Sequence, residues 1–522
     1  MRIPVGLTKR WLVCGLVGVL VGVLLLPQAS PAGTIDSADP PRGLFSDEWM
    51  VILFAGQKAG YAHQTMSRQD DVVTTRMIMT FRLGRAGQDI ELSTMESSEE
   101  TVAGKPLSFE SAMKVAVMDV VYRGRFTGSK VHVETTQGGM TLEQTYTLPE
   151  GVVLSWGAYA EQLRRGLEEG TTYELLTYAP SLVQSQPVTT RVAVGKCETI
   201  DLLGRSVAGT RVNSTVISPM GALDQVSWMD ADGRLIKMEM DMMGLGSIEL
   251  ILSDKETATR QAPAPEFFVN TMVPAGRKID RAAARRLEFR LRVTGEEEPI
   301  PDLPTTGMQK PRRGKDNSIQ LVVTRQDHKA LQSARLSEPS ADLAPYLEPN
   351  IWINSDDPEV IAMAKTAAGD AKTPYQIADR LRCYVTEVIE EKNLNIGFAS
   401  ASEVCRNKEG DCSEHGVLLA ALGRVHRIPS RVVIGLVYVP WFAGTADTFG
   451  FHMWTQFHLG GQWVDFDAAQ RESDCNPTHI AVATSSLKDS SLADMAFGLI
   501  KIIGRLEIEV LSADPPTAIT SP

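Results

Sequence analysis

The sequence predicts a multidomain protein in which an N-terminal antiparallel β domain precedes a C-terminal α+β domain. Two observations predict this order. Between residues 46 and 258, short runs alternate apolar and polar side chains, which is the period of a strand with one buried face. From residue 346 onward, capped helical segments come first and long apolar strands follow them. Helices followed by an antiparallel sheet are typical of the α+β class.

Length and composition limit the classes of protein that fit. The 522 residues leave room for about two to four domains. The formal net charge of −12 argues against a general nucleic-acid binder, and the one basic cluster, residues 310–315, is expected to be a solvated linker. The six cysteines have neither the density of a disulfide framework nor the spacing of a zinc site. We therefore expect no metal and no cofactor.

The N-terminal segment has the order of an export signal. Basic residues up to Arg10 precede an apolar run at 11–26, and small residues and prolines follow it. The run is shorter than the roughly 20 residues of a membrane span, and the cleavage site is poor. Residues 1–32 are therefore expected to be a cleaved signal peptide or a retained membrane anchor, with the body exported to the periplasm or beyond. Residues 33–45, rich in Pro, Ser, Asp and Gly, predict a tether.

The predicted β domain spans residues 46–258. Alternating runs flank residues 230–233, whose Asp-Ala-Asp-Gly sequence predicts a hairpin turn. One helix is expected near residues 158–168. The many short strands indicate an antiparallel sheet that is curved or half-closed.

Residues 259–345 have a mixed pattern and predict a connector. A helix is expected at 282–286, and strands are expected at 287–293 and 318–324. Between these strands, prolines and glycines at 300–317 predict a loop.

The predicted α+β domain spans residues 346–512, and residues 513–522 are expected to be a C-terminal tail. Asp357 is a helix cap before a first-turn proline, and Thr373 with Gln376 forms a capping box. Further strands are expected at 431–439, 453–458 and 462–466.

Cys412 is predicted to lie in the first turn of a buried helix. Gly410 supplies a turn, Asp411 can cap the helix, and residues 417–422 are all apolar. The N–H groups and the dipole at a helix N-terminus favour the thiolate, which is the reactive form of cysteine. The same N–H groups can stabilise an oxyanion, with Gln456 as a further candidate donor.

His452 and Asp467 are predicted to face each other across a β-hairpin. His452 begins one strand, Gly460 and Gly461 form the turn, and Asp467 ends the returning strand. A carboxylate beside a histidine fixes the tautomer of the ring and supports its protonated form. Together with a cysteine nucleophile, such a pair supplies the base and the orienting acid of thiol-dependent acyl transfer.

Two other residues are alternatives for these roles, and a third could regulate the nucleophile. Asp465 lies two residues before Asp467, on the same side of a regular strand. His415 lies three residues after Cys412 and is an alternative base. Cys405, expected on a loop, could form a disulfide with Cys412 in an oxidising compartment and act as a redox switch.

Four motifs resemble those of the transglutaminase-like superfamily, which has a papain-like fold. They are Glu409-Gly410-Asp411-Cys412, Arg427-Ile428-Pro429-Ser430-Arg431-Val432-Val433, His452-Met453-Trp454 and Trp463-Val464-Asp465-Phe466-Asp467. The resemblance covers residues 346–470, about a quarter of the chain. It implies a catalytic triad of Cys412, His452 and Asp467. The family's Asp-Pro-Thr at the acid is Asp-Ala-Ala here, so the loop after Asp467 is expected to differ.

The residues and the resemblance predict an exported thiol enzyme of bacterial type that acts on a protein or peptide substrate. Hydrolysis of peptide or amide bonds is favoured, because an exported enzyme in abundant water needs no site for a second substrate. Two alternatives stay open. One is a transglutaminase that forms isopeptide bonds, and the other is a non-catalytic envelope protein that keeps the fold.

Overall fold

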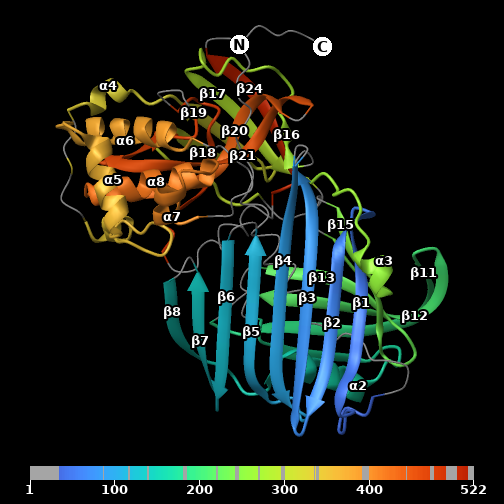
Figure 1. Cartoon of the computed structure of the whole chain (residues 1–522). Helices are drawn as coiled ribbons and strands as arrows, with labels where there is room; N and C mark the ends of the chain where they lie inside the picture. Colours follow the sequence, from blue (N-terminus) through green and yellow to red (C-terminus); the bar gives the residue numbers. More distant parts are fainter. Residues whose placement is uncertain are drawn as a thin grey trace. The chain divides into compact units, whose positions relative to one another are not determined.

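The computed structural model describes residues 35–514 except for 86–87, 116–117, 138–139, 180–184, 219–220, 242–245, 268–270, 295–299, 334–335, 337–339, 391–398, 443, 471–474 and 489–501. These residues form two compact units that divide after Phe267, here named the β unit and the α+β unit (Figure 1). The expected signal peptide or anchor at 1–32 lies outside the described residues. In the part of the chain that the structure describes, no helix is long and apolar enough to cross a membrane.

Strands dominate the β unit. They are β1 (Gly43–Phe54), β2 (Gln57–Gln69), β3 (Val72–Arg85), β4 (Gln88–Thr101), β5 (Pro106–Val115), β6 (Met118–Thr127), β7 (Lys130–Gln137), β8 (Met140–Thr147), β9 (Val152–Val153), β10 (Thr172–Thr177), β11 (Val188–Leu202), β12 (Arg205–Ser218), β13 (Gly221–Met229), β14 (Leu235–Asp241) and β15 (Ser247–Ser253). All belong to one sheet, in the order β8-β7-β6-β5-β4-β3-β2-β1-β15-β14-β13-β12-β11-β10-β9. Neighbours pair antiparallel, except that β9 and β10 are parallel. Figure 1 shows β1–β8 as one layer with β11–β13 crossing behind it, so the predicted antiparallel β domain is confirmed.

The helix of the β unit begins three residues before its predicted position. Helix α2 (Ser155–Arg165) starts where the buried carboxylate of Glu100, on β4, accepts hydrogen bonds from backbone N–H groups. The donors are Leu154 at 2.9 Å, Trp156 at 2.6 Å and Gly157 at 3.0 Å. A carboxylate at a helix N-terminus satisfies N–H groups that have no partner within the helix. Because Glu100 is 54 residues away in sequence, local pattern could not place this boundary.

The segment predicted to be a tether belongs to the core of the β unit from Ile35 onward. Ile35 and Phe45 are buried and pack in one cluster with Met66 and Trp156. The composition of this segment is typical of a linker, but two of its apolar side chains, Ile35 and Phe45, find partners in the folded unit. A short helix, α3 (Lys255–Thr259), follows β15.

The hairpin predicted at residues 230–233 joins β13 to β14. The side chain of Asp230 accepts hydrogen bonds from the N–H groups of Asp232 and Arg234, at 3.0 and 2.9 Å. Gly233 takes a positive φ of 79°, which the turn requires.

The α+β unit contains two sheets. The first has the order β16-β21-β20-β23, with β22 paired to β21, and its strands are β16 (Val273–Pro274), β20 (Ser430–Phe442), β21 (Thr445–Leu459), β22 (Gln462–Phe466) and β23 (Ile480–Ser485). The second has the order β18-β19-β17-β24, and its strands are β17 (Arg286–Val293), β18 (Gln309–Arg313), β19 (Ile319–Thr324) and β24 (Leu506–Asp514). The predicted strands at 431–439, 453–458 and 462–466 are therefore present.

The second sheet corrects three expectations about the connector and the tail. The helix expected at 282–286 is a turn, and β17 begins at Arg286. The loop expected at 300–317 contains β18, so the basic cluster lies partly on an edge strand, where a proline such as Pro311 is tolerated. β24 pairs with β17 up to Asp514, so the expected tail boundary falls inside a strand. In each case pairing between distant segments outweighs the local pattern.

The helices of the α+β unit are α4 (His328–Leu331), the 3₁₀ helix η2 (Ala341–Tyr346), α5 (Pro358–Ala368), α6 (Pro374–Val388), α7 (Ala401–Asn407) and α8 (Cys412–Val425). The predicted caps are present: Asp357 accepts hydrogen bonds at the start of α5, and Thr373 with Gln376 forms the capping box of α6. Helix α7 was not predicted, although Ser400 and Glu403 form a capping box there.

Candidate active site

Cys412 is the first residue of α8 and is fully buried. The side chain of Asp411 accepts a hydrogen bond from the N–H of Ser413 at 3.0 Å, and the side chain of Glu414 accepts one from the N–H of Asp411 at 2.9 Å. This reciprocal cap defines where the helix begins. The cysteine therefore lies at the positive end of the helix dipole, as the sequence predicts.

Two contacts place the first turns of α8 beside strand β21. Thr455 donates a hydrogen bond from its hydroxyl to the backbone oxygen of Gly416, at 2.8 Å. A Cβ atom on Gly416 would lie 3.4 Å from Cγ of Met453, the residue after His452. Cys412 is one helical turn before Gly416, so the helix N-terminus lies near the part of β21 that carries His452.

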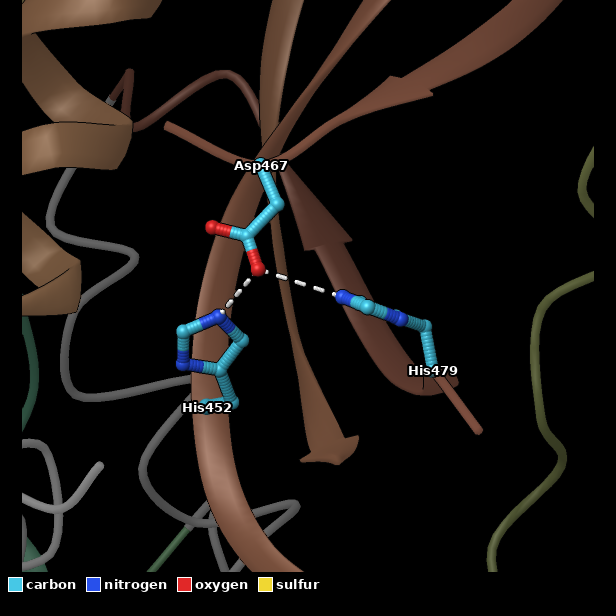
Figure 2. A group of neighbouring side chains, drawn as sticks. All are labelled: His452, Asp467 and His479. Atoms are coloured by element: carbon cyan, nitrogen blue, oxygen red, sulfur yellow. Dashed lines mark hydrogen bonds and ion pairs between the residues drawn. The ribbon is translucent and has the colours of Figure 1, made fainter. Parts of the chain in front are cut away.

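His452 and Asp467 form a buried hydrogen-bonded pair (Figure 2). Nε2 of His452 lies 2.7 Å from Oδ2 of Asp467, and both side chains are at most 4% exposed. The β21–β22 hairpin brings them together, as predicted. Nδ1 of His452 is buried and has no hydrogen-bond partner among the described residues.

Figure 2 also shows a residue that sequence reasoning missed. His479, immediately before β23, lies with Nε2 3.1 Å from the same Oδ2 of Asp467. It is 3% exposed. No motif or period in the sequence points to His479, because it reaches Asp467 only when strand β23 pairs with β20. A histidine at the start of an apolar strand, twelve residues after the acid, was the only available signal.

The two histidines decide the charge of Asp467. Burial acts to raise the pKa of its carboxyl group, but the nearby His452 and the hydrogen bonds from His452 and His479 outweigh burial. The net effect holds the pKa of Asp467 well below its usual range, so the carboxylate is ionised at neutral pH. Its other oxygen accepts a hydrogen bond from the N–H of Ala469 at 2.9 Å.

The two alternative residues make hydrogen bonds of their own. Oδ1 of Asp465 accepts hydrogen bonds from Trp454 Nε1 and Gln456 Nε2, both at 2.7 Å, and burial raises the pKa of Asp465. Gln456 therefore uses its amide N–H within this network. Nδ1 of His415 lies 2.5 Å from the backbone oxygen of Asp411, one turn earlier in the same helix.

Cys405 lies on helix α7, not on a loop, so that expectation was wrong. The cap at Ser400 starts this helix and draws the segment into regular structure. Burial raises the pKa of the Cys405 thiol, which disfavours its reactive form. Among the described residues no cysteine forms a disulfide, and the proposed switch with Cys412 stays a prediction.

The donor atoms of His452, Asp467 and His479 lie within 4.8 Å of one another, close enough for a metal site. Both Nε2 atoms, however, point at the carboxylate oxygen as hydrogen-bond donors. A nitrogen that carries a proton has no lone pair for a metal. With both Nε2 atoms protonated, the three residues form a hydrogen-bonded group.

One family model matches part of this chain. Residues 361–468 match the model of the transglutaminase-like superfamily, so the α+β unit contains a transglutaminase-like domain. No curated protein matches the chain.

In two of the similar solved structures, the part that matches this protein is nearly the whole of the solved chain. A candidate cysteine protease from Cytophaga hutchinsonii is 16% identical, over 45% of this chain and 93% of that chain, with a TM-score of 0.31. A β-barrel-like protein of a domain of unknown function from Brucella abortus is 16% identical, over 40% of this chain and 95% of that chain, with a TM-score of 0.31. A candidate protease from Parabacteroides distasonis is 11% identical, over 77% of this chain and 70% of that chain, with a TM-score of 0.18.

Proposed function

We propose that this protein is an exported thiol enzyme that hydrolyses peptide or amide bonds, with Cys412 as nucleophile, His452 as base and Asp467 as orienting acid. The observation that carries the proposal is the buried pair of His452 and Asp467, in which Nδ1 of His452 has no hydrogen-bond partner among the described residues. A histidine oriented by a carboxylate through one nitrogen presents the other as a base.

The chemistry follows from these roles. The Cys412 thiol gives its proton to His452, and the thiolate attacks the carbonyl carbon of the substrate. When the C–N bond breaks, the amine leaves with the proton from His452, and an acyl thioester forms. Water then attacks the thioester while His452 takes its proton, which releases the carboxylic acid and restores the thiol. The backbone N–H groups at the start of α8 are the candidate oxyanion donors.

The first test is alkylation of Cys412 by iodoacetamide, followed peptide by peptide from pH 4 to 9. We expect fast labelling well below pH 8.5, the approximate pKa of an ordinary cysteine, and loss of that reactivity in His452→Ala. If Cys412 is labelled slowly, with the pH dependence of an ordinary thiol, the proposed enzyme activity would be rejected and a binding protein that keeps the fold would be favoured.

A primary amine separates hydrolysis from transglutamination. If the acyl thioester reacts with water, added amine does not enter the product. If it reacts with an amine, the label appears in the product and depends on Cys412. A protein whose cellular role survives Cys412→Ala would instead be a non-catalytic envelope protein.

The export of the chain is part of the proposal and has its own test. The apolar run at 11–26 would direct the body across the membrane and either be cleaved or stay as an anchor. Fractionation of cells with protease protection, and the N-terminal residue of the mature chain, decide both points.

A further inference from the structure

His479 is held between two oxygen atoms that can only accept hydrogen bonds. Its Nδ1 lies 3.1 Å from the backbone oxygen of Asn476, and its Nε2 lies 3.1 Å from Oδ2 of Asp467. Neither a carbonyl oxygen nor an ionised carboxylate has a proton to give. The ring can make both hydrogen bonds at once only when both of its nitrogens carry a proton, which makes it a positively charged imidazolium.

The turn before His479 fixes the position of the ring. Oδ1 of Asn476 accepts hydrogen bonds from the N–H and the hydroxyl of Thr478, at 3.0 and 2.6 Å, and both residues are fully buried. The N–H of His479 donates to the backbone oxygen of Asn476 at 3.1 Å. Trp454 meets the His479 ring edge to face, with centroids 5.2 Å apart and an interplanar angle of 86°. The imidazole therefore has little room to turn away from Asp467.

His452 has a different set of contacts. Its Nε2 donates to the same oxygen of Asp467, whereas its Nδ1 has no hydrogen-bond partner in the described part of the chain. The two rings share one carboxylate oxygen, and their centroids are 6.1 Å apart (Figure 2). Of these two rings, His452 is the one with a nitrogen that faces no hydrogen-bond partner among the described residues and is available to accept a proton.

We propose that His479 is a positioning residue for the acyl-transfer reaction. Its protonated ring holds the Asp467 carboxylate against His452, and its charge disfavours a second proton on His452 until the thiol supplies one. The inference rests on the proposed function. The titratable groups that face His479 are Asp467 and Asp465 from the end of β22 and His452 from β21.

The test compares two substitutions at His479 in the full-length chain. His479→Gln keeps an N–H donor for Asp467 but removes the charge, and His479→Leu removes both. The control is His458→Gln, which makes the same change on strand β21 at a ring that packs on Trp463. The measurement is the pH profile of Cys412 alkylation, with thermal unfolding of each variant to show that it is folded.

Both His479 variants should move the midpoint of the profile to higher pH, by about one unit, because a positive charge near the two reacting groups is lost. The maximal labelling rate should fall about tenfold in His479→Leu, which leaves Asp467 without its second donor, and should stay near the wild-type rate in His479→Gln. His458→Gln should keep the wild-type profile. A purely structural role would change unfolding without moving the midpoint.

Two results would overturn the inference. One is a His479→Gln profile that superimposes on the wild-type profile. The other is one zinc ion bound per wild-type chain and lost in His479→Gln, because the ring would then be a metal ligand. Failure of the proposed function gives a separate signal, since it appears in the wild-type chain as slow labelling of Cys412.

Discussion

At the scale of single residues, the N-terminus of α8 depends on a glycine that no other residue can replace without strain. Gly410 has a φ of +149°, and an added Cβ atom would lie 2.3 Å from Cβ of Glu414 and 2.5 Å from its Cγ. Glu414 is the residue that completes the helix cap next to Cys412. Both the positive φ of Gly410 and its close contact with Glu414 therefore help to fix the position of Cys412, the proposed nucleophile.

Gly410→Ala should destabilise the α+β unit by about 2–3 kcal/mol and slow the alkylation of Cys412, because Glu414 must move and the cap is lost. Denaturant unfolding and the labelling rate measure the two effects. The control is Gly461→Ala, which also has a positive φ, of 79°, but has nothing within 4 Å of the added atom. It should cost about 1 kcal/mol and leave labelling unchanged. Equal losses in both variants would contradict the role of the Glu414 contact.

At the scale of elements, helix α8 packs on strand β21 through two glycines with different surroundings. A Cβ atom on Gly423 would lie 2.2 Å from Cε1 of Phe457, a fully buried ring. A Cβ atom on Gly416 would lie at an ordinary contact distance from Met453. The helix therefore lies so close to the sheet at Gly423 that there is no room for a side chain, whereas there is room for one at Gly416.

The two glycines give a matched pair of substitutions. Gly423→Ala should destabilise the protein by about 2 kcal/mol, because the Phe457 ring cannot move out of a packed core. Gly416→Ala should be neutral or stabilise by up to about 1 kcal/mol, since alanine favours the helix. Unfolding by denaturant compares them directly, and the opposite order would contradict this packing.

A buried glutamine joins the two sheets of the α+β unit at the edge of strand β23. Gln309, on β18, donates from Nε2 to the backbone oxygen of Ala481 and accepts at Oε1 from its N–H, both at 2.8 Å. Nε2 also donates to the backbone oxygen of Pro304 at 2.9 Å. These bonds satisfy the outer edge of β23, the strand that follows His479.

Gln309→Glu should destabilise the unit by about 2 kcal/mol, because a carboxylate would face two carbonyl oxygens without a donor. Gln309→Met, which has a similar size and no charge, isolates the loss of the hydrogen bonds from the added repulsion. Chemical unfolding at pH 7 measures both variants. A Glu variant as stable as the wild-type chain would show that the edge is satisfied in another way.

At the scale of the whole molecule, the chain builds two units with separate cores, and the segment expected to connect them belongs to the second. β17, β18 and β19 come from that segment, and β24 comes from the end of the described chain. The sheet they form makes the α+β unit larger than the residues 361–468 that match the superfamily model. The β unit has a buried acid of its own at Glu100.

The β unit should become less stable as the pH rises from about 5 to 8. Burial raises the pKa of Glu100 from its ordinary value of 4.5 to about 7, against the backbone hydrogen bonds that lower it. The fold therefore prefers the protonated acid. Its contribution is complete below about pH 4.5 and declines toward pH 7, by on the order of 3 kcal/mol in total.

Hydrogen exchange of the α2 amides in the full-length chain, corrected for the intrinsic effect of pH, measures this decline. Glu100→Gln has no acid to titrate at this position, so it should flatten the dependence in α2. Glu161→Gln makes the same change on helix α2 itself, at a side chain that is 16% exposed and pairs with Arg164 and Arg165, and it should keep the wild-type slope. If exchange in the Glu100→Gln variant depends on pH as strongly as in the wild-type chain, the pH effect must come from another group.

The sequence alone determined the features that local chemistry specifies. Alternation marked the β domain, and side-chain caps marked α5, α6 and α8, because each signal lies within a few neighbouring residues. The hairpin around Gly460 and Gly461 is also local, so His452 and Asp467 could be paired before the structure was known.

Only the tertiary structure decided the features that depend on distant partners. Glu100 sets the start of α2, and β18 and β24 become strands because β19 and β17 accept them as neighbours. His479 belongs to the site for the same reason, since β23 returns along β20 and brings the ring to Asp467. A sequence pattern shows only the periodicity and the caps of one segment. The contacts of Glu100, β18, β24 and His479 form where segments far apart in the chain bury their polar groups together.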